Sequence, residues 1–336
     1  MELSWQVMAF WGGFLLFVLV MLALDLGVFH REQHVVSVKE ALTWTGVWIS
    51  MALIFNVLIL FFWDSFFQPV SGGGGVDYTN KEAAMAFLAG YVVEESLSID
   101  NIFVILMIFS YLHVPREYQH RILFYGILGA LVFRLIFVVL GTAILSRFLW
   151  TMIIFGLFLI GTGIKMLLDG EKKVDLEKNF AVRTLRRLLP VTKELDGPHF
   201  FVMKEGRRWA TPLFVVLMTI EFTDIIFAVD SIPAIFAITS NPFIVFTSNV
   251  FAILGLRSLF FAVDGLVRLF HYLRHALSAI LVFVGGKMIY NYVQHHMEDW
   301  PKLPISVSLL VILGILAAAV ILSVLFPPKG THETAA

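Results

Sequence analysis

Residues 221–234 read EFTDIIFAVDSIPA, and this stretch decides how the chain is interpreted. It places Glu221, Asp224 and Asp230 inside an otherwise apolar run that covers residues 211–238. A run of roughly 20 mostly apolar residues is long enough to cross a bilayer as a helix. A charge at the bilayer centre costs about 2.5–3.5 kcal/mol, so acids inside such a run are rare and mark functional sites. The stretch therefore predicts a membrane-spanning helix that carries a site.

The composition of the whole chain agrees with a lipid environment. Of its 336 residues, 59% are hydrophobic and only 15% are charged, whereas soluble domains have about 45–50% apolar and about 25% charged residues. The net charge of −1 gives no basic field that would attract nucleic acid. The absence of cysteine excludes disulfides, thiolate metal sites and cysteine nucleophiles in this chain.

Apolar runs of spanning length occur repeatedly along the sequence, and none shows the alternation that membrane β-strands require. The predicted spans cover about residues 6–30, 41–63, 82–110, 119–143, 149–169, 211–238, 243–265, 275–295 and 305–327. We therefore expect an all-α polytopic membrane protein with about nine transmembrane helices, in which residues 1–336 form one transmembrane domain.

The distribution of lysine and arginine predicts the orientation. Most bases outside the spans fall on one side, including those of the charged segment 170–210, and the other side holds only Lys81, Arg147 and Lys302. Because cytoplasmic loops carry the excess of positive charge, we expect the N-terminus outside, residues 170–210 as a cytoplasmic loop, and the C-terminus in the cytoplasm.

The third to fifth spans resemble the sixth to eighth. The motif EESLSIDN at residues 94–101 aligns with DIIFAVDS at 224–231, and GTGIKM at 161–166 aligns with FVGGKM at 283–288. A repeat of three spans must enter the membrane from opposite faces, and such inverted repeats place transport sites at their interface near the midplane. We predict a first repeat at 82–169 and a second at 211–295. Their glycines, Gly161, Gly163, Gly285 and Gly286, are expected to permit close helix packing.

Acidic residues outnumber basic ones inside the spans. The acids are Asp25, Glu94, Glu95, Asp100, Glu221, Asp224 and Asp230, and the bases are Arg134, Lys165, Arg257 and Lys287. Together with the polar side chains of Asn101 and Ser231, the carboxylates offer hard oxygen ligands that suit Mn²⁺, Mg²⁺ or Ca²⁺. The alternative is that the acids and bases form salt bridges that hold the bundle together.

Helix geometry divides these acids. At 100° per residue, Glu94 shares a helix face with Asn101, and Asp224 shares one with Ser231. Asp100 and Asp230 lie off those faces on straight helices. A break at Pro233 is expected to turn Asp230 toward the site.

These motifs resemble those of the TerC family of membrane proteins, in particular its Alx-like branch. The similarity is carried by residues 94–101, 188–192, 221–234 and 251–257, and it extends over nearly the whole chain. The resemblance implies a bacterial inner-membrane protein of the LysE-like transporter superfamily that exports Mn²⁺. The acidic motif residues of the family correspond to Glu94, Glu95, Asp100, Asn101, Glu221, Asp224, Asp230 and Ser231 in this sequence.

The expected function is therefore export of a divalent cation, most of all Mn²⁺, through a carboxylate site near the midplane. Protons are the expected counter-ion, because carboxylates that bind a metal also exchange it for H⁺. Asp25, Arg134, Arg257, Lys165 and Lys287 are possible supporting residues. Two alternatives stay open: an intramembrane partner in the assembly or metalation of other proteins, and an aspartyl-type hydrolase with a pair of acids.

Overall fold

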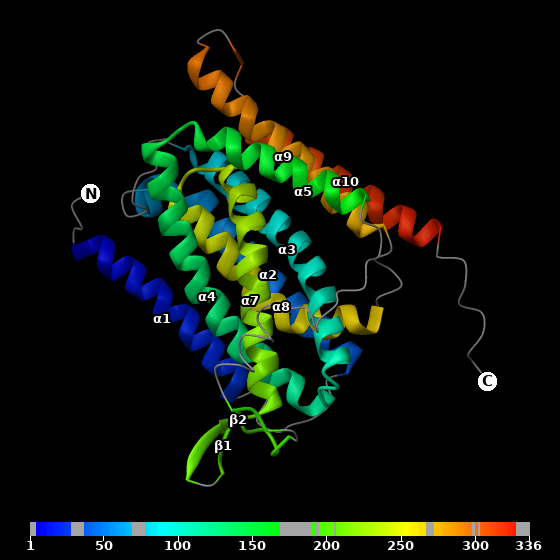
Figure 1. The fold of residues 1–336 in the computed structure, drawn as a ribbon. Helices are drawn as coiled ribbons and strands as arrows, with labels where there is room; N and C mark the ends of the chain where they lie inside the picture. Colours follow the sequence, from blue (N-terminus) through cyan, green and yellow to red (C-terminus); the bar gives the residue numbers. More distant parts are fainter. Residues whose placement is uncertain are drawn as a thin grey trace.

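The computed structural model of this protein describes residues 5–27, 37–68, 78–168, 190–192, 195–204, 206–266, 272–297, 300–301 and 303–326. Within these ranges the chain forms nine α-helices and one two-stranded β-hairpin (Figure 1). The helices are α1 (Trp5–Gly27), α2 (Val38–Phe62), α3 (Asn80–Tyr111), α4 (Arg116–Arg147), α5 (Thr151–Leu168), α7 (Pro212–Phe236), α8 (Pro242–Leu266), α9 (Leu273–His296) and α10 (Ile305–Leu325).

The described helices correspond one for one to the predicted spans, and the all-α polytopic fold is confirmed. Seven of them, α2, α4, α5, α7, α8, α9 and α10, are long and apolar enough to cross a membrane. Helix α3 is 32 residues long but contains Glu94, Glu95 and Asp100, which lower its hydropathy. It begins at a capping box in which Thr79 and Glu82 bond each other's backbone N–H groups.

Helix α8 forms the centre of the bundle. It packs against α2, α3 and α4, and 94% of its most apolar 18-residue stretch is buried. Phenylalanine side chains from α1, α2, α3 and α8 pack there in one cluster that includes Phe14, Phe55, Phe87 and Phe251. In contrast, α2, α5 and α10 expose many large apolar side chains, as expected of surfaces that face lipid.

Helices α5, α9 and α10 run side by side across one end of the bundle (Figure 1). Helices α5 and α9 are antiparallel and cross closely at two places. A Cβ at Gly285 would meet the carbonyl of Gly156 at 2.6 Å, and a Cβ at Gly163 would meet that of Ser278 at 2.8 Å. Close packing is thus the role of Gly163 and Gly285, but not of Gly161 and Gly286, beside which a Cβ would meet nothing within 4 Å.

The two close contacts between α5 and α9 are related to each other by the internal repeat. The alignment of residues 161–166 with 283–288 pairs Gly163 with Gly285 and Gly156 with Ser278. The contact between Gly163 and Ser278 therefore becomes the contact between Gly285 and Gly156 when the repeats are exchanged. An antiparallel pair with this property is what inversion requires at α5 and α9, while inversion of the complete repeats stays a prediction.

The segment 170–210 contains structure that the sequence analysis did not anticipate. Strands β1 (Phe201–Lys204) and β2 (Arg207–Ala210) pair as an antiparallel hairpin whose turn contains Gly206 at φ +73°. The strands were not predicted because the segment is rich in bases and each strand has only four residues. Residues 169–189, which hold the start of the predicted cytoplasmic loop, lie outside the described residues.

Candidate functional site

Four helices meet at the side chain of Arg134 on α4. Its guanidinium donates to the carboxylate of Glu94 on α3 and to the amide oxygen of Asn249 on α8. Its Nη2 also lies 3.9 Å from a carboxylate oxygen of Asp224 on α7. Arg134 and Glu94 have side-chain exposures of only 1% and 0%, so water contributes little to balancing these charges. We call Glu94, Arg134, Asp224 and Asn249 the arginine cluster.

For Glu94 and Asp224, the salt-bridge alternative of the sequence analysis is therefore the observed arrangement. The pairing is still incomplete, because Oε2 of Glu94 and Oδ2 of Asp224 are buried without a hydrogen-bond partner among the described residues. A buried, unsatisfied carboxylate oxygen is costly. These oxygens remain available to a bound water or cation.

Glu221 lies one helical turn before Asp224 and is also buried. Its carboxylate occupies the space beside Gly129 of α4, where a Cβ would collide with both of its oxygens. It interacts unfavourably with the charge of Asp224, and its Oε2 has no hydrogen-bond partner in the described structure. Gly129 thus makes room for one of the predicted site acids.

Asp100 on α3 and Asp230 on α7 form a second acidic group, which we call the aspartate pair. The two acids lie near enough to each other for their charges to interact. Asp230 accepts a long hydrogen bond of 3.5 Å from the hydroxyl of Thr162 on α5, and Lys165, one turn further along α5, stabilises its charge. The charge of Arg274 acts favourably on Asp100.

The predicted break in α7, which was expected to turn Asp230 toward the site, is absent from the structure. Helix α7 is not broken at Pro233, since it continues to Phe236. Asp230 lies beside Thr162 of α5, whereas Asp224, on the same helix, lies near Arg134 of α4. The angular offset that separated these residues from Glu94 and Asp224 in the sequence analysis therefore reflects two separate acidic groups.

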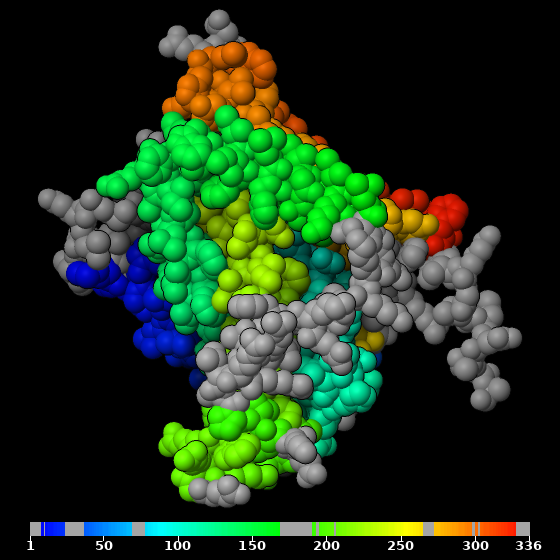
Figure 2. Space-filling view, viewed as in Figure 1, coloured from blue at the N-terminus to red at the C-terminus, as the bar shows by residue number. Residues whose placement is uncertain are grey.

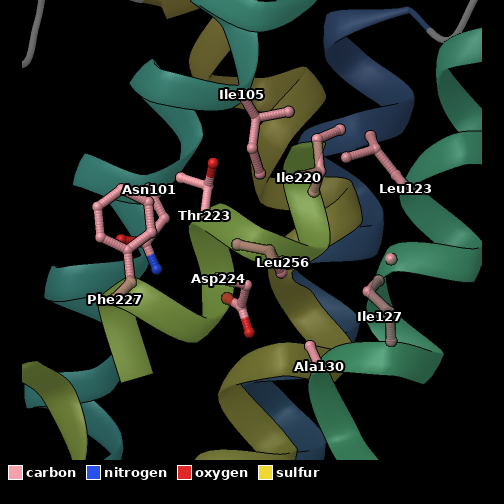
Figure 3. Close-up of a pocket in the computed structure, with 11 residues that line it drawn as sticks. Asn101, Ile105, Leu123, Ile127, Ala130, Ile220, Thr223, Asp224, Phe227 and Leu256 are labelled. Carbon is pink, nitrogen blue, oxygen red and sulfur yellow. The ribbon is translucent and has the colours of Figure 1, made fainter. Parts of the chain in front are cut away.

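A small cavity lies between α3, α4 and α7, beside the arginine cluster (Figure 3). Its volume of about 20 Å³ is enough for one water molecule or a small ion. The polar side chains at its wall are those of Asn101, Thr223 and Asp224, and most of the other lining residues are apolar. Gly126 and Ala130 lie on the α4 side, where larger residues would fill the space.

Glu95 and Ser231 lie apart from both acidic groups in their contacts. Glu95 accepts a hydrogen bond of 2.8 Å from the hydroxyl of Tyr91, one turn earlier on α3, and lies near Trp48 of α2. Ser231 is buried with no hydrogen-bond partner for its hydroxyl among the described residues. The helix assignment of α1 includes Asp25, but its side chain lies outside the described part.

Arg257 and Lys287 are both buried. Lys287 makes no ion pair with an acid of the described ranges. Two residues that contact the predicted site residues, Asn249 and Thr162, were not predicted from the sequence. An asparagine within the apolar run of α8 was a usable signal for the former, whereas a threonine in an apolar helix often bonds its own backbone.

The described residues contain no group of three or more histidine, aspartate or glutamate side chains that is ready to hold a metal ion. A hard cation does not need such a cage, because Mg²⁺ commonly keeps several waters and binds through one or two carboxylates. The aspartate pair and Thr162 offer that smaller set of oxygen atoms. Mn²⁺ accepts the same carboxylate, carbonyl and water ligands.

Comparison with known proteins shows relatives over almost the full length. The chain is 49% identical to the membrane protein STKORF319 of Myxococcus xanthus over 315 residues, which are 94% of this chain and 92% of the relative. It is 45% identical over 314 residues to the Escherichia coli K12 protein called "Putative membrane-bound redox modulator Alx", with 93% of both chains covered. A membrane protein of Rickettsia bellii is 36% identical over 311 residues, 92% of this chain and 97% of the relative.

No solved structure matches the chain. The TerC family, described as a family of integral membrane proteins, matches residues 79–330. This match contains α3 to α10, and with them the arginine cluster and the aspartate pair. The protein is thus a multi-pass integral membrane protein and belongs to the TerC family.

Proposed function

We propose that this protein transports divalent cations across the membrane, with Mn²⁺ as its principal substrate and the aspartate pair as the place where the ion binds. The observation that carries the proposal is that Asp100 and Asp230, from two different helices, lie near enough for their charges to interact, beside the hydroxyl of Thr162. Two neighbouring carboxylates inside a membrane protein are stabilised most by binding a doubly charged cation. Their repulsion then becomes attraction to the ion.

The arginine cluster is less suited to hold the ion in this conformation. The guanidinium of Arg134 already lies against Glu94 and near Asp224, and its positive charge repels a cation. The cavity lined by Asn101 and Asp224 is proposed as a second binding site for the ion. It is close to the aspartate pair along the chain, because Asn101 follows Asp100 directly on α3. An ion that leaves the aspartate pair would meet oxygen ligands there.

Mn²⁺ is proposed over Mg²⁺ and Ca²⁺ on the strength of family resemblance, since all three accept oxygen ligands. Export and exchange for protons complete the proposal. Carboxylates that release a metal take up protons, so each cycle would return one or two protons in the opposite direction.

A flux assay tests the proposal. The purified protein is reconstituted into proteoliposomes, and entry of Mn²⁺ is followed with a dye trapped inside. We expect flux that saturates with Mn²⁺ and falls at least about tenfold in Asp230→Asn, a change that removes the charge and keeps the shape. Flux through this variant at the unmodified rate would contradict the proposal.

The matched control is Asp264→Asn. Asp264 is an exposed acid near the end of α8 that lies 3.8 Å from Arg116, whereas Asp100 and Asp230 are half-buried. Its neutralisation should leave Mn²⁺ flux unchanged. Equal losses in both variants would indicate a general effect of charge and not a site.

The same preparations distinguish the alternatives. A hydrolase would cleave a peptide or lipid substrate in the absence of Mn²⁺ flux, and an assembly partner would co-purify with another protein while the isolated chain shows no transport. A redox role, as the name of the Alx relatives states, would require other groups than thiols here, because the chain has no cysteine.

We also propose a bacterial inner membrane location with the N-terminus outside and the C-terminus in the cytoplasm. The bias of lysine and arginine between the loops supports it. Fusion of green fluorescent protein to the C-terminus should yield fluorescent cells, and fusion of a periplasmic phosphatase at the same place should be inactive. The reverse pattern would invert the orientation.

A further inference from the structure

The β-hairpin of residues 201–210 has features that transport does not explain. It projects from the end of the bundle, below α7 (Figures 1 and 2). It leads directly into α7, whose first residue is Pro212. Helix α7 has 25 residues and is therefore about 37 Å long, which exceeds the roughly 30 Å of hydrocarbon in a bilayer. The first turns of α7 can thus extend into the headgroup layer.

Aromatic contacts attach the hairpin to α7 and α4 near the ends of these helices. The ring of Phe201 lies 4.5 Å from that of Phe214 in the first turn of α7. The ring of Phe200 lies 5.2 Å from that of Tyr125 on α4, and the guanidinium of Arg121 lies over the same Phe200 ring at 5.3 Å. The base of the hairpin is therefore attached to the polar ends of two membrane-spanning helices.

The register of the strands brings like charges together. Lys204 pairs directly with Arg207 across the hairpin, and both are exposed. Directly opposite side chains have Cβ atoms about 4.5–5.5 Å apart, and like charges at this spacing destabilise a sheet. An anion held between the two side chains would remove this repulsion.

Other side chains of the hairpin favour the headgroup layer as the source of that anion. Strand alternation places Trp209 on the same face as Lys204 and Arg207, and its indole N–H is buried with no hydrogen-bond partner in the described structure. The opposite face exposes Phe201 by 48% and Met203 by 66%. Bases, tryptophan and exposed apolar side chains together are typical of segments at the membrane interface.

We propose that this hairpin is a binding site for anionic phospholipids, in which Lys204 and Arg207 bracket one headgroup phosphate and Phe201 and Met203 enter the layer beside it. The inference does not depend on the transport function. It fits a lipid better than a soluble phosphate because the same hairpin also exposes the apolar side chains of Phe201 and Met203, on the face opposite the two bases. It also fixes the hairpin to the same membrane that α7 crosses.

The test uses the full-length protein and vesicles of equal parts phosphatidylglycerol and phosphatidylcholine. The protein is extracted with limited detergent, and the retained lipids are counted by mass spectrometry. The unmodified protein should retain phosphatidylglycerol in excess. In Lys204→Gln/Arg207→Gln the excess should fall, by about fivefold for each base removed.

Two controls make the result specific. Arg147→Gln removes an exposed base at the opposite end of α4 and should leave the ratio of retained lipids unchanged. Lys204→Arg/Arg207→Lys keeps both charges and should also keep the ratio. An unchanged ratio in the double glutamine variant would overturn the proposal, as would displacement of the lipid excess by inorganic phosphate at millimolar concentration, which would identify a site for free phosphate.

Discussion

The arginine cluster and the aspartate pair contain the same kind of residue on the same two helices, yet their surroundings differ. Glu94 and Asp224 share a buried guanidinium and an asparagine from two further helices. Asp100 and Asp230, six residues later on each helix, lie near each other, Asp230 accepts a long bond from Thr162, and the charges of Arg274 and Lys165 act on them. The first arrangement resembles an internal brace, and the second leaves negative charge for a mobile ion.

This difference teaches that acidic residues in a membrane span do not all serve the same purpose. A base supplied by the protein converts a carboxylate pair into a structural contact. A carboxylate pair that no buried guanidinium joins in this way keeps more of its negative charge and gains stability from a cation. The predictions that follow test whether the two groups respond oppositely to loss of charge.

The largest effect is expected for Arg134→Met. It leaves Glu94 and Asp224 buried without their counter-charge, and removal of one partner from a buried ion pair costs about 3–5 kcal/mol. Thermal unfolding in detergent should show a large fall in melting temperature. Arg147→Met, at the exposed end of the same helix, should change stability by less than about 0.5 kcal/mol.

A smaller effect is expected for Gly129→Ala. The new Cβ would collide with the carboxylate of Glu221, and overpacking of this kind typically costs about 1–3 kcal/mol. Gly126→Ala, one turn earlier, is the control because its Cβ would only reach Ile220 at 3.7 Å. Equal melting temperatures for the two variants would show that Glu221 does not occupy that space.

Asp230→Asn should not destabilise the protein. Neutralising one member of a repelling pair removes an unfavourable interaction, so the melting temperature in the absence of metal should stay the same or rise by the equivalent of about 1 kcal/mol. A fall as large as that of Arg134→Met would mean that the aspartate pair is also a structural brace.

The smallest effect is expected for Thr162→Val. This change removes the 3.5 Å hydrogen bond to Asp230 and keeps the shape of the side chain. Because such bonds contribute about 0.5–1.5 kcal/mol, the Mn²⁺ concentration at half-maximal flux should change by a factor of about 2–10. Thr142→Val is the control, since Thr142 donates only to a carbonyl of its own helix.

Much of the fold followed from the sequence, because lipid imposes helices of a length that hydropathy reveals. The bounds of α9 (Leu273–His296) lie within two residues of the predicted span 275–295. The hairpin escaped prediction, since strands of four residues, FVMK and RRWA, are too short to show a hydropathy signal. Short polar segments take their structure from contacts such as that between Phe201 and Phe214, which a sequence does not display.

The candidate site was predicted as one set of residues, and the structure divides it. Helical periodicity predicted that Asp100 and Asp230 lie off the faces of Glu94 and Asp224, but it gave no partner for either group. The arginine cluster is completed by Arg134 and Asn249, whose positions depend on how α4 and α8 pack against α3 and α7. Periodicity describes one helix at a time and does not identify the partner helix.

The most direct test of the central claim is the position of Mn²⁺ in crystals soaked with the ion, located by its anomalous scattering. The account predicts a peak between the carboxylates of Asp100 and Asp230 that is absent in Asp230→Asn, while Arg134 still contacts Glu94. A peak at Glu94 and Asp224 with Arg134 displaced, or no peak near either group in a preparation that transports Mn²⁺, would contradict it.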